Sequence, residues 1–270
     1  MTRHVPHPPA DQPDTEGRAC RSADLFVVVP FFDEERSLPA TLRALARQSD
    51  RAFTLVLVDN ASTDGSATVA RNFAAASPPF PVEIIHEGQK GTGAASDTGF
   101  RHAIARGARW IARTDADCLP HPDWVAELKR ALVDARLDFV AGKIRPREDE
   151  PRTIADRLVI PAMLWIAERY GRLHRRGPQF RYPYFMAAGN NLAITAALYE
   201  ASGGFPRTAI EAVHEDRALS ETVRTMTSRA AVWPGAVVYN SARRVRAYGY
   251  LNTLRWYRNH GYRPQVVDVR

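Results

Sequence analysis

The chain has 270 residues, of which 45% are hydrophobic and 25% charged. These are ordinary values for a globular protein, so the composition excludes a fibrous or largely disordered chain. The longest apolar runs, "LFVVVP" and "TLVLV", are far shorter than the roughly 18 residues that a membrane-spanning helix needs. A formal net charge of +7 favours anionic partners, namely nucleotides, phospholipid surfaces or nucleic acid, without choosing among them.

The two ends of the chain are expected to lie outside the folded domain. Residues 1–24 are rich in Pro, Asp and Arg and lack the apolar stretch of a signal peptide, which predicts a disordered tail and a cytoplasmic protein. Residues 251–270 form a basic and aromatic segment. Cys20 and Cys118 have neither a disulfide framework nor metal-ligand spacing, so a reducing compartment is compatible.

Short β-branched runs alternate with amphipathic stretches in the first half of the chain. The stretch after the first run places Leu38, Leu42 and Leu45 at helical spacing. Strands are predicted at residues 24–30, 53–59, 81–86, 109–114 and 138–143. Helices are predicted between them, at residues 37–48, 64–76, 93–107 and 121–135. This alternation predicts a mostly parallel, Rossmann-like α/β sheet with helices on both faces.

The alternation ends near residue 145, and helices dominate the prediction for the second half. A long amphipathic helix is expected at residues 153–173, a loop and a helix within 185–205, and a further helix at 214–226. We therefore expect a single domain at residues 25–250. Its nucleotide-binding half would be residues 25–145, and its acceptor-binding half residues 146–250.

Candidate binding residues lie where the predicted strands end, and ligands bind at that edge of a parallel sheet. Pro30, Phe32 and Glu34 lie at the end of the first strand, and Asp59 ends the second. One interpretation of Asp59 is a surface residue beside a helix cap made within "STD", residues 62–64. The other is a carboxylate that accepts a hydrogen bond from the amide or imide edge of a base.

Asp115 and Asp117 lie two residues apart just after the fourth strand. In an extended segment, residues at this spacing point to the same side. Two carboxylates there suit Mg²⁺ or Mn²⁺ shared with a diphosphate, because these ions prefer oxygen ligands. A solubilising turn into the next helix is the alternative interpretation.

Three further features each have a structural and a functional interpretation. Lys90 lies in the glycine-containing "QKGTG", which is either a plain turn or a loop that approaches a phosphate. Glu215 and Asp216 begin a helix, where acids favour the helix dipole, but either could serve as a general base. Asn190 and Asn191 either cap a helix or donate to a hydroxyl-rich ligand.

The basic segment near the C-terminus also has two interpretations. Arg243 and Arg244 belong either to a solvated basic face or to a segment that folds over a diphosphate and neutralises it. Candidate acceptor or diphosphate contacts are therefore Asn190, Asn191, Glu215, Arg243 and Arg244.

Taken in chain order, these segments resemble glycosyltransferase family 2, a large group of enzymes with the GT-A fold. "VVVPFFDEE" resembles the opening strand and loop, "VDNASTDGS" the signature after the second strand, and "TDADC" the D-x-D position. "GNNLAI", "SGGF" and "HEDRAL" are similar to the later acceptor-loop and E-D-x-x-L segments. The resemblance runs from about residue 25 to residue 250.

The resemblance implies a reaction and its participants. A sugar would pass from a nucleoside-diphosphate sugar to an acceptor hydroxyl, with inversion and with Mg²⁺ or Mn²⁺ as cofactor. The donor would be a UDP-sugar ahead of a GDP- or dTDP-sugar, and the acceptor a saccharide or a lipid-linked molecule. The protein would bind no nucleic acid and would contact the inner face of a membrane peripherally.

The resemblance also implies roles for particular residues. Asp216 would be the catalytic base, Asp117 the metal ligand and Asp115 a contact of the ribose or diphosphate. The residues implied around the base and ribose are Pro30, Phe32, Glu34, Asp59 and Lys90.

The sequence departs from the family pattern in three places. Phe32 replaces the usual Tyr, and Asp33 replaces the usual Asn. No clear histidine follows "VVYNSARR" to serve as a further metal ligand, and His260 is assigned no role. "NTLRW", residues 252–256, matches only in part the Q-x-x-R-W motif of processive synthases, so a non-processive enzyme is expected.

Two other functions are compatible with parts of the sequence. A nucleotidyltransferase would share the α/β architecture and acidic metal site, but "PFFDEE" is acidic where a basic glycine-rich loop is expected. A non-catalytic protein that binds nucleic acid or an anionic membrane would explain the basic charge. It would not explain the carboxylates at the strand ends.

Overall fold

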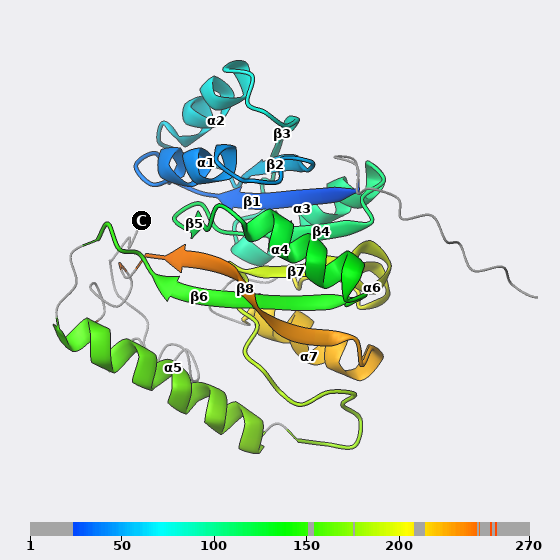
Figure 1. Ribbon diagram of the computed structural model, residues 1–270. Coiled ribbons are helices and arrows are strands. Elements are labelled where there is room, and N and C mark those ends of the chain that lie inside the picture. The colour runs from blue at the N-terminus through cyan, green and yellow to red at the C-terminus, as the bar shows by residue number, and fades with distance from the viewer. Residues whose placement is uncertain are drawn as a thin grey trace, which may run out of the picture.

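The computed structural model describes residues 24–150, 154–174, 176–207 and 214–241, together with residues 243, 249 and 252. Most of the expected N-terminal tail, Arg244 and nearly all of the segment 251–270 lie outside the described residues. Figure 1 shows a central sheet with helices packed around it and one long helix, α5, at its side.

One eight-stranded sheet organises the fold, in the strand order β3-β2-β1-β4-β7-β6-β8-β5. The strands are β1 (Leu25–Phe31), β2 (Thr54–Asp59), β3 (Val82–His86), β4 (Trp110–Arg113), β5 (Leu119–Pro120), β6 (Phe139–Pro146), β7 (Leu192–Thr195) and β8 (Ala230–Asn240). The helices are α1 (Leu38–Ala46), α2 (Ser66–Ala75), α3 (Thr92–Ala105), α4 (Trp124–Lys129), α5 (Ile154–His174), α6 (Ala196–Ala201) and α7 (Glu215–Met226), and a π-helical turn, Arg130–Asp134, follows α4. The mixed α/β fold predicted from the sequence is confirmed.

The first half of the chain forms the parallel part of the sheet. β1 pairs in parallel with β2 and β4, and β2 pairs in parallel with β3. All seven residues of β1 are buried, as expected for a strand covered on both faces. The carboxyl ends of β1, β2 and β4 consequently meet at one edge, where the predicted site residues lie.

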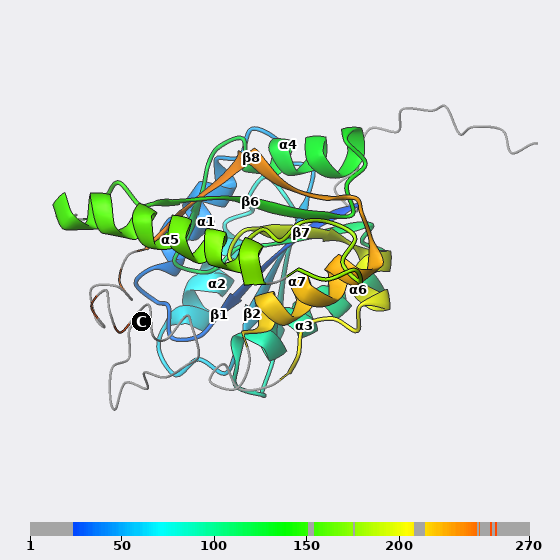
Figure 2. The same cartoon turned by 90° about the horizontal axis from the view of Figure 1, so that it is seen from below.

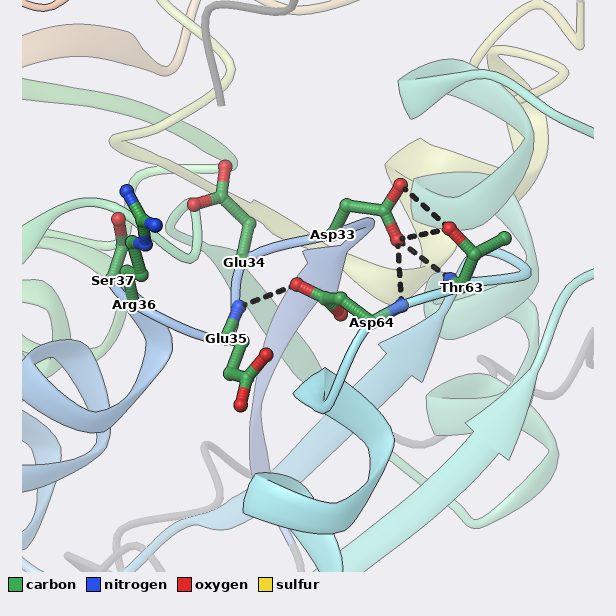
Figure 3. A pocket seen from close by; sticks show the side chains of 7 residues that line it. All are labelled: Asp33, Glu34, Glu35, Arg36, Ser37, Thr63 and Asp64. Carbon is green, nitrogen blue, oxygen red and sulfur yellow. Dashed lines mark hydrogen bonds between the residues drawn. The ribbon is translucent and has the colours of Figure 1, made fainter.

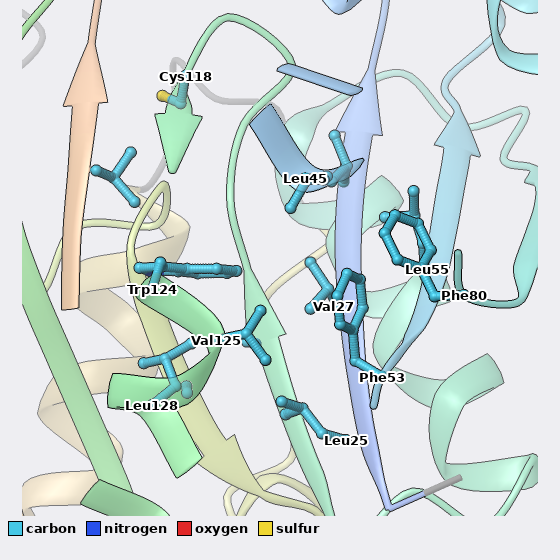
Figure 4. Packing of buried hydrophobic residues seen from close by; sticks show 14 of the residues in the cluster. Leu25, Val27, Leu45, Phe53, Leu55, Phe80, Cys118, Trp124, Val125 and Leu128 are labelled. Carbon is cyan, nitrogen blue, oxygen red and sulfur yellow. The ribbon is translucent and has the colours of Figure 1, made fainter. Parts of the chain in front are cut away.

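Alternate residues of β1 supply two hydrophobic cores, one on each face of the sheet. Val27 and Val29 pack in the core that contains side chains of α1, α2 and α4. Phe26 and Val28 pack in the core that contains side chains of α3, α6 and α7. Figure 4 shows the first core, including Trp124 above the sheet. Each such buried side chain contributes about 1.5–3 kcal/mol relative to an exposed one.

The second half of the sheet differs from the prediction because β5, β7 and β8 are additional strands. β7 lies between β4 and β6 and is antiparallel to both, and its residues 192–195 fall in a segment for which a loop and a helix were predicted. The run "LAIT" is too short for its periodicity to separate a buried strand from a helix. Thr195, whose Oγ1 accepts a hydrogen bond from the N–H of Leu198, begins α6. The asparagines at 190 and 191 therefore do not cap this helix.

The predicted long helix is present as α5, which has 21 residues and lies beside β6 and β8 (Figures 1 and 2). Several of its large apolar side chains are 56–61% exposed, namely Trp165, Ile166, Tyr170 and Leu173. Among the described residues, none of the helices combines the length and the apolar composition that crossing a membrane requires.

Candidate functional site

The loops that follow β1 and β2 are joined by hydrogen bonds (Figure 3). Oδ1 of Asp33 accepts a hydrogen bond from the N–H of Thr63 at 2.6 Å, and the N–H of Glu35 donates to Asp64 at 3.0 Å. The two loops border an acidic pocket of about 330 Å³. Its lining residues are Asp33, Glu34, Glu35, Arg36, Ser37, Thr63 and Asp64.

Asp33 occupies a backbone conformation that explains its residue type. Its φ of 51° lies in the left-handed region, which Asn and Asp adopt more readily than other non-glycine residues. The replacement of Asn by Asp thus preserves the loop conformation and supplies an acceptor for Thr63.

Asp59, at the end of β2, uses one carboxylate oxygen in the turn that follows. Its Oδ1 accepts a hydrogen bond from the N–H of Ser62 at 2.9 Å, and its Oδ2 lies 3.9 Å from Nδ1 of His86. Asp64 accepts from the N–H of Ser66, the first residue of α2, so Asp64 is the residue of "STD" that holds the helix start. Asp59 is therefore partly a structural residue, because the turn holds its Oδ1 and His86 lies near its Oδ2.

Phe32, Lys90 and Asn60 connect three strand ends. Nζ of Lys90 lies 5.0 Å from the centre of the Phe32 ring, in a cation–π contact. The buried side chain of Asn60 donates to the carbonyl of Gln89 at 2.7 Å and accepts from the N–H of Gly91 at 2.9 Å. The sequence analysis gave Asn60 no role, although it holds the loop that carries Lys90. Pro30 lies inside β1 and is buried.

Asp115 and Asp117 do not lie in an extended segment, which corrects the expectation that they point to the same side. The N–H of Cys118 donates to the carbonyl of Asp115 at 3.1 Å, so residues 115–118 form a turn. The two acids consequently have different cationic partners, Arg113 for Asp115 and Arg243 for Asp117.

Arg243 lies between the carboxylates of Glu34 and Asp117. Its Nη1 donates to Oε2 of Glu34 at 2.9 Å, and its Nε lies 3.2 Å from Oδ2 of Asp117. Burial raises the pKa of Asp117, and the positive charge of Arg243 offsets part of that effect. One guanidinium, that of Arg243, therefore joins the predicted donor loop to the predicted metal ligand.

Arg113, the last residue of β4, is a further charged residue that sequence reasoning missed. It is 1% exposed, and its Nη2 lies 3.1 Å from Oδ1 of Asp115 while its Nη1 lies 3.3 Å from Oε1 of Glu215. A cation so buried requires acidic partners. The signal in the sequence was an Arg that ends an otherwise apolar strand next to an acidic motif.

Asp216 is fixed by two backbone N–H groups. Its Oδ2 accepts from Gly189 at 2.9 Å and its Oδ1 from Arg217 at 2.7 Å. Burial raises the pKa of Asp216, against the opposing effects of the Gly189 N–H and the Arg113 charge. Burial likewise raises the pKa of Glu215, which Arg113 partly offsets. These two acids begin α7, as the sequence predicts.

The neighbouring asparagines have different environments. Asn191 is fully buried, accepts from Nε1 of Trp124 at 2.9 Å and donates to the carbonyls of Lys143 and Ala236. It therefore holds the sheet together, which corrects the expectation that it contacts a ligand. Asn190 is 9% exposed, and its Oδ1 has no hydrogen-bond partner within the part of the chain that the structure describes.

The acidic residues fit a metal ion that takes few ligands from protein. Among the described residues, no three Asp, Glu, His or Cys side chains form a ligand cluster. Asp117 nevertheless pairs with a cation, the guanidinium of Arg243, and its pKa is influenced by the nearby charges of Asp115 and Glu34. This environment suits a divalent ion whose other ligands are diphosphate and water oxygens.

Residues 26–196 match the family model described as "Glycosyl transferase family 2", so the chain belongs to glycosyltransferase family 2. The match begins in β1, includes the loops with Glu34, Asp59 and Asp115, and ends at the start of α6. Membership in a family of glycosyltransferases is at variance with the two alternatives, a nucleotidyltransferase and a non-catalytic basic protein.

Individual proteins with named activities are similar to parts of the chain. An undecaprenyl-phosphate mannosyltransferase from Micrococcus luteus is 34% identical over 122 residues, which are 45% of this chain and 48% of the relative. The chain spans less than half the length of the curated relatives it matches.

Solved structures with the same fold cover more of the chain. The mannosyltransferase PcManGT from Pyrobaculum calidifontis, in complex with GDP-Man and Mn²⁺, has a TM-score of 0.60 at 25% identity and covers 89% of this chain and 65% of its own. TarS residues 1–349 from S. aureus has a TM-score of 0.61 at 14% identity, with coverage of 86% and 64%. These likenesses confirm the GT-A fold.

Proposed function

We propose that the protein transfers a sugar from a nucleoside-diphosphate sugar to an acceptor hydroxyl, in one displacement with inversion and without processive chain growth. The acceptor oxygen bonds to the anomeric carbon while the bond from that carbon to the diphosphate oxygen breaks. The hydroxyl proton passes to Asp216, and the nucleoside diphosphate leaves with the bonding electrons.

The placement of Asp216 is the observation that carries this proposal. A general base must be held in a fixed position within reach of the proton that it accepts. The N–H groups of Gly189 and Arg217 hold the carboxylate of Asp216, and Arg113 joins the neighbouring Glu215 to Asp115. This network supports the proposed roles of Asp216 as the base and Asp115 as the donor-side acid.

The donor is proposed to bind at the carboxyl ends of β1, β2 and β4. Phe32 would stack on the base, Asp59 would accept from its edge, Lys90 and Glu34 would lie nearby, and Asp115 would contact the ribose or diphosphate. Uracil and thymine each present one imide N–H, whereas guanine presents two adjacent donors, and the turn to Ser62 leaves one oxygen of Asp59. This supports a UDP- or dTDP-sugar ahead of a GDP-sugar, although the PcManGT complex contains GDP-Man. We keep the UDP-sugar first, as the resemblance implies.

Asp117 is proposed to hold the divalent ion, Mg²⁺ or Mn²⁺, together with diphosphate oxygens and water. When bound, the ion supplies positive charge that stabilises the departing diphosphate. With the ion bound, Arg243 would no longer pair with Asp117 and Glu34, and it could pair with the diphosphate instead. Asn190 is retained as a candidate acceptor contact because its Oδ1 is buried without a partner among the described residues.

The acceptor is proposed to be a saccharide carried by a lipid, and the protein to be cytoplasmic and peripheral to the membrane. The exposed apolar side chains of α5 lie among the basic residues Arg169 and Arg172, a combination typical of helices at an anionic lipid surface. The relative from Micrococcus luteus is named for undecaprenyl phosphate, which is itself a lipid.

A lipid phosphate is a second candidate acceptor, favoured by that relative's name. A phosphate oxygen is ionised near neutral pH and needs no base, unlike a hydroxyl. The Asp216→Asn variant separates the two candidates, because it should abolish transfer to a hydroxyl and leave transfer to a phosphate largely intact.

A calorimetric screen of UDP-, GDP- and dTDP-sugars, with and without Mn²⁺, tests the proposed function. Binding of one donor that strengthens with Mn²⁺ and is lost in Asp117→Ala supports it. Transfer is then measured with lipid-linked saccharide and with polyprenyl phosphate. Absence of binding by every donor at millimolar concentration, with the folded protein verified by circular dichroism, contradicts the proposal.

A further inference from the structure

Arg113 contacts both sides of the candidate site from a fully enclosed position. Its Nε and Nη2 lie 3.2 and 3.1 Å from the same oxygen of Asp115, and its Nη1 and Nη2 lie 3.3 and 3.4 Å from Oε1 of Glu215. The planar fork of a guanidinium fixes direction as well as charge. The turn after β4 and the first residue of α7 therefore share one rigid partner.

A second connection runs from Arg113 to Asp216 through Gly189. A Cβ atom added to Gly189 would lie 2.9 Å from Cζ of Arg113, so the guanidinium packs directly against this backbone. The N–H of the same residue donates to Oδ2 of Asp216 at 2.9 Å. A change in Arg113 would thus disturb Asp216 by two routes, through Gly189 and through the adjacent Glu215.

We propose that Arg113 is a positioning residue that places the carboxylate of Asp216 relative to the donor-side Asp115 and keeps it able to accept a proton. This inference rests on the proposed role of Asp216 as the base. Among the described residues, Arg113 donates to Asp115 and Glu215, and its proposed effect on the reaction passes through these neighbours.

The charges around Asp216 give the physical reason. The charged groups that face it are Asp115 and Arg113 from β4 and the turn after it, and Glu215 from its own helix. Within the part of the chain that the structure describes, Arg113 is a buried cation that interacts with three carboxylates, those of Asp115, Glu215 and Asp216. Without it, Asp216 would retain its proton to a higher pH, because burial already disfavours its charged form.

Three variants test the proposal. Arg113→Met keeps the length of the side chain without charge, whereas Arg113→Lys keeps the charge without the fork. Arg224→Met is the matched control, because Arg224 is also 1% exposed but lies in the last turn of α7, against the Phe180 ring. All three are expected to lower the melting temperature.

Two measurements distinguish positioning from mere stability. In Arg113→Met the acid limb of the pH profile of kcat should move to higher pH by about one unit, and kcat itself should fall at least about tenfold. Arg113→Lys should restore the limb and only part of kcat, and Arg224→Met should leave the limb unchanged. The carboxyl-carbon NMR resonance of Asp216, assigned by its absence in Asp216→Asn, should show the same shift in its titration.

The NMR titration separates this inference from the proposed function. If the wild type transfers no sugar but the titration of Asp216 moves in Arg113→Met, the proposed function is wrong and the link from Arg113 to Asp216 stands. If the titration and the acid limb stay at their wild-type positions while activity falls only as stability falls, as in Arg224→Met, the inference is overturned.

Discussion

Nε of Arg243 lies 3.2 Å from Oδ2 of Asp117, so the predicted metal ligand is paired with a cation of the protein itself. The same guanidinium donates to Glu34 at 2.9 Å. A divalent ion at Asp117 and Arg243 would therefore compete for the same negative charge. This competition has a measurable consequence for metal affinity without a donor.

Arg243→Ala should bind Mn²⁺ severalfold more tightly than the wild type in the absence of nucleotide, because a competing cation is removed. Electron paramagnetic resonance of free Mn²⁺ measures this affinity directly. The matched control is Arg229→Ala, since Arg229 pairs with Asp138 away from the site. Equal Mn²⁺ affinity in Arg243→Ala and the wild type would show that the Arg243 contact does not compete with metal.

Asp216→Asn should reduce transfer to a hydroxyl acceptor by about 10²–10⁴-fold, the range that a positioned base supplies. Burial raises the pKa of Asp216, so wild-type activity should fall as the pH decreases through a value above the usual range for Asp. Initial rates across pH give this limb, and donor affinity by calorimetry should remain within about twofold. A variant with wild-type turnover would exclude Asp216 as the base.

Asn191→Ala should destabilise the protein by about 2–4 kcal/mol, because it leaves Nε1 of Trp124 and two carbonyls without a partner inside the sheet. Urea unfolding provides the free energy. Asn190→Ala is the paired variant, expected to change stability by less than about 1 kcal/mol but to lower transfer. The reverse pattern would mean that the two asparagines have been assigned each other's role.

Glu87→Gln should weaken the attachment of Arg207 to the residues around Glu87. Partial burial acts to raise the pKa of Glu87. The hydrogen bonds from Thr98, Arg207 and the N–H of Gln89 outweigh this effect and lower the pKa to about 2, from an ordinary 4.5. A lowered carboxyl pKa stabilises the fold above pH 4.5, and this contribution disappears as the pH falls toward 2.

At neutral pH the loss in Glu87→Gln should be on the order of 1–3 kcal/mol, and the difference from the wild type should vanish near pH 2. Chemical unfolding at several pH values measures both. Glu200→Gln, at an exposed position of α6, is the control and should change little. A pH-independent difference would indicate a packing effect in place of a charge effect.

Replacement of Trp165 and Leu173 by Ser should abolish sedimentation with vesicles that contain anionic lipid. The two side chains are 61% and 60% exposed on α5, so the change should cost little stability. Ile84→Ser, at an exposed apolar position of β3, is the control. Unchanged sedimentation in the double variant, or wild-type protein that fails to sediment at low salt, would contradict membrane contact through α5.

The sequence predicted the parallel half of the fold well because its signals are local. β1 and β2 are continuous apolar runs, and the helix between them has clear amphipathic spacing, as Leu38, Leu42 and Leu45 illustrate. β7 was missed because a run of four residues, three of them buried, can belong to either a strand or a helix until its neighbours are known. Its pairing with both β4 and β6 is a property of the tertiary fold.

The acids of the site were located from motifs, but their partners were not. The sequence placed Asp115, Asp117 and Asp216 at element ends, where the structure has them. It gave no indication that Arg113 joins Asp115 to Glu215, or that Arg243 joins Glu34 to Asp117. In each case the two carboxylates that the arginine joins are far apart in the chain. Local spacing also suggested an extended D-x-D, whereas the turn at Cys118 separates the two acids.

The pairing of β6 with β7 makes the region between them exchangeable. Ala141 in β6 lies opposite Leu192 in β7, and the N–H of Gly142 donates to the carbonyl of Asn191 at 2.9 Å. β6 continues along β8 to Pro146, and the chain returns to the sheet at Leu192 beside Ala141, with α5 contained in the excursion. The register between β6 and β7 sets no fixed length for this excursion. Under the proposed function, in which the second half of the chain binds the acceptor, acceptor choice can therefore change without a new donor site.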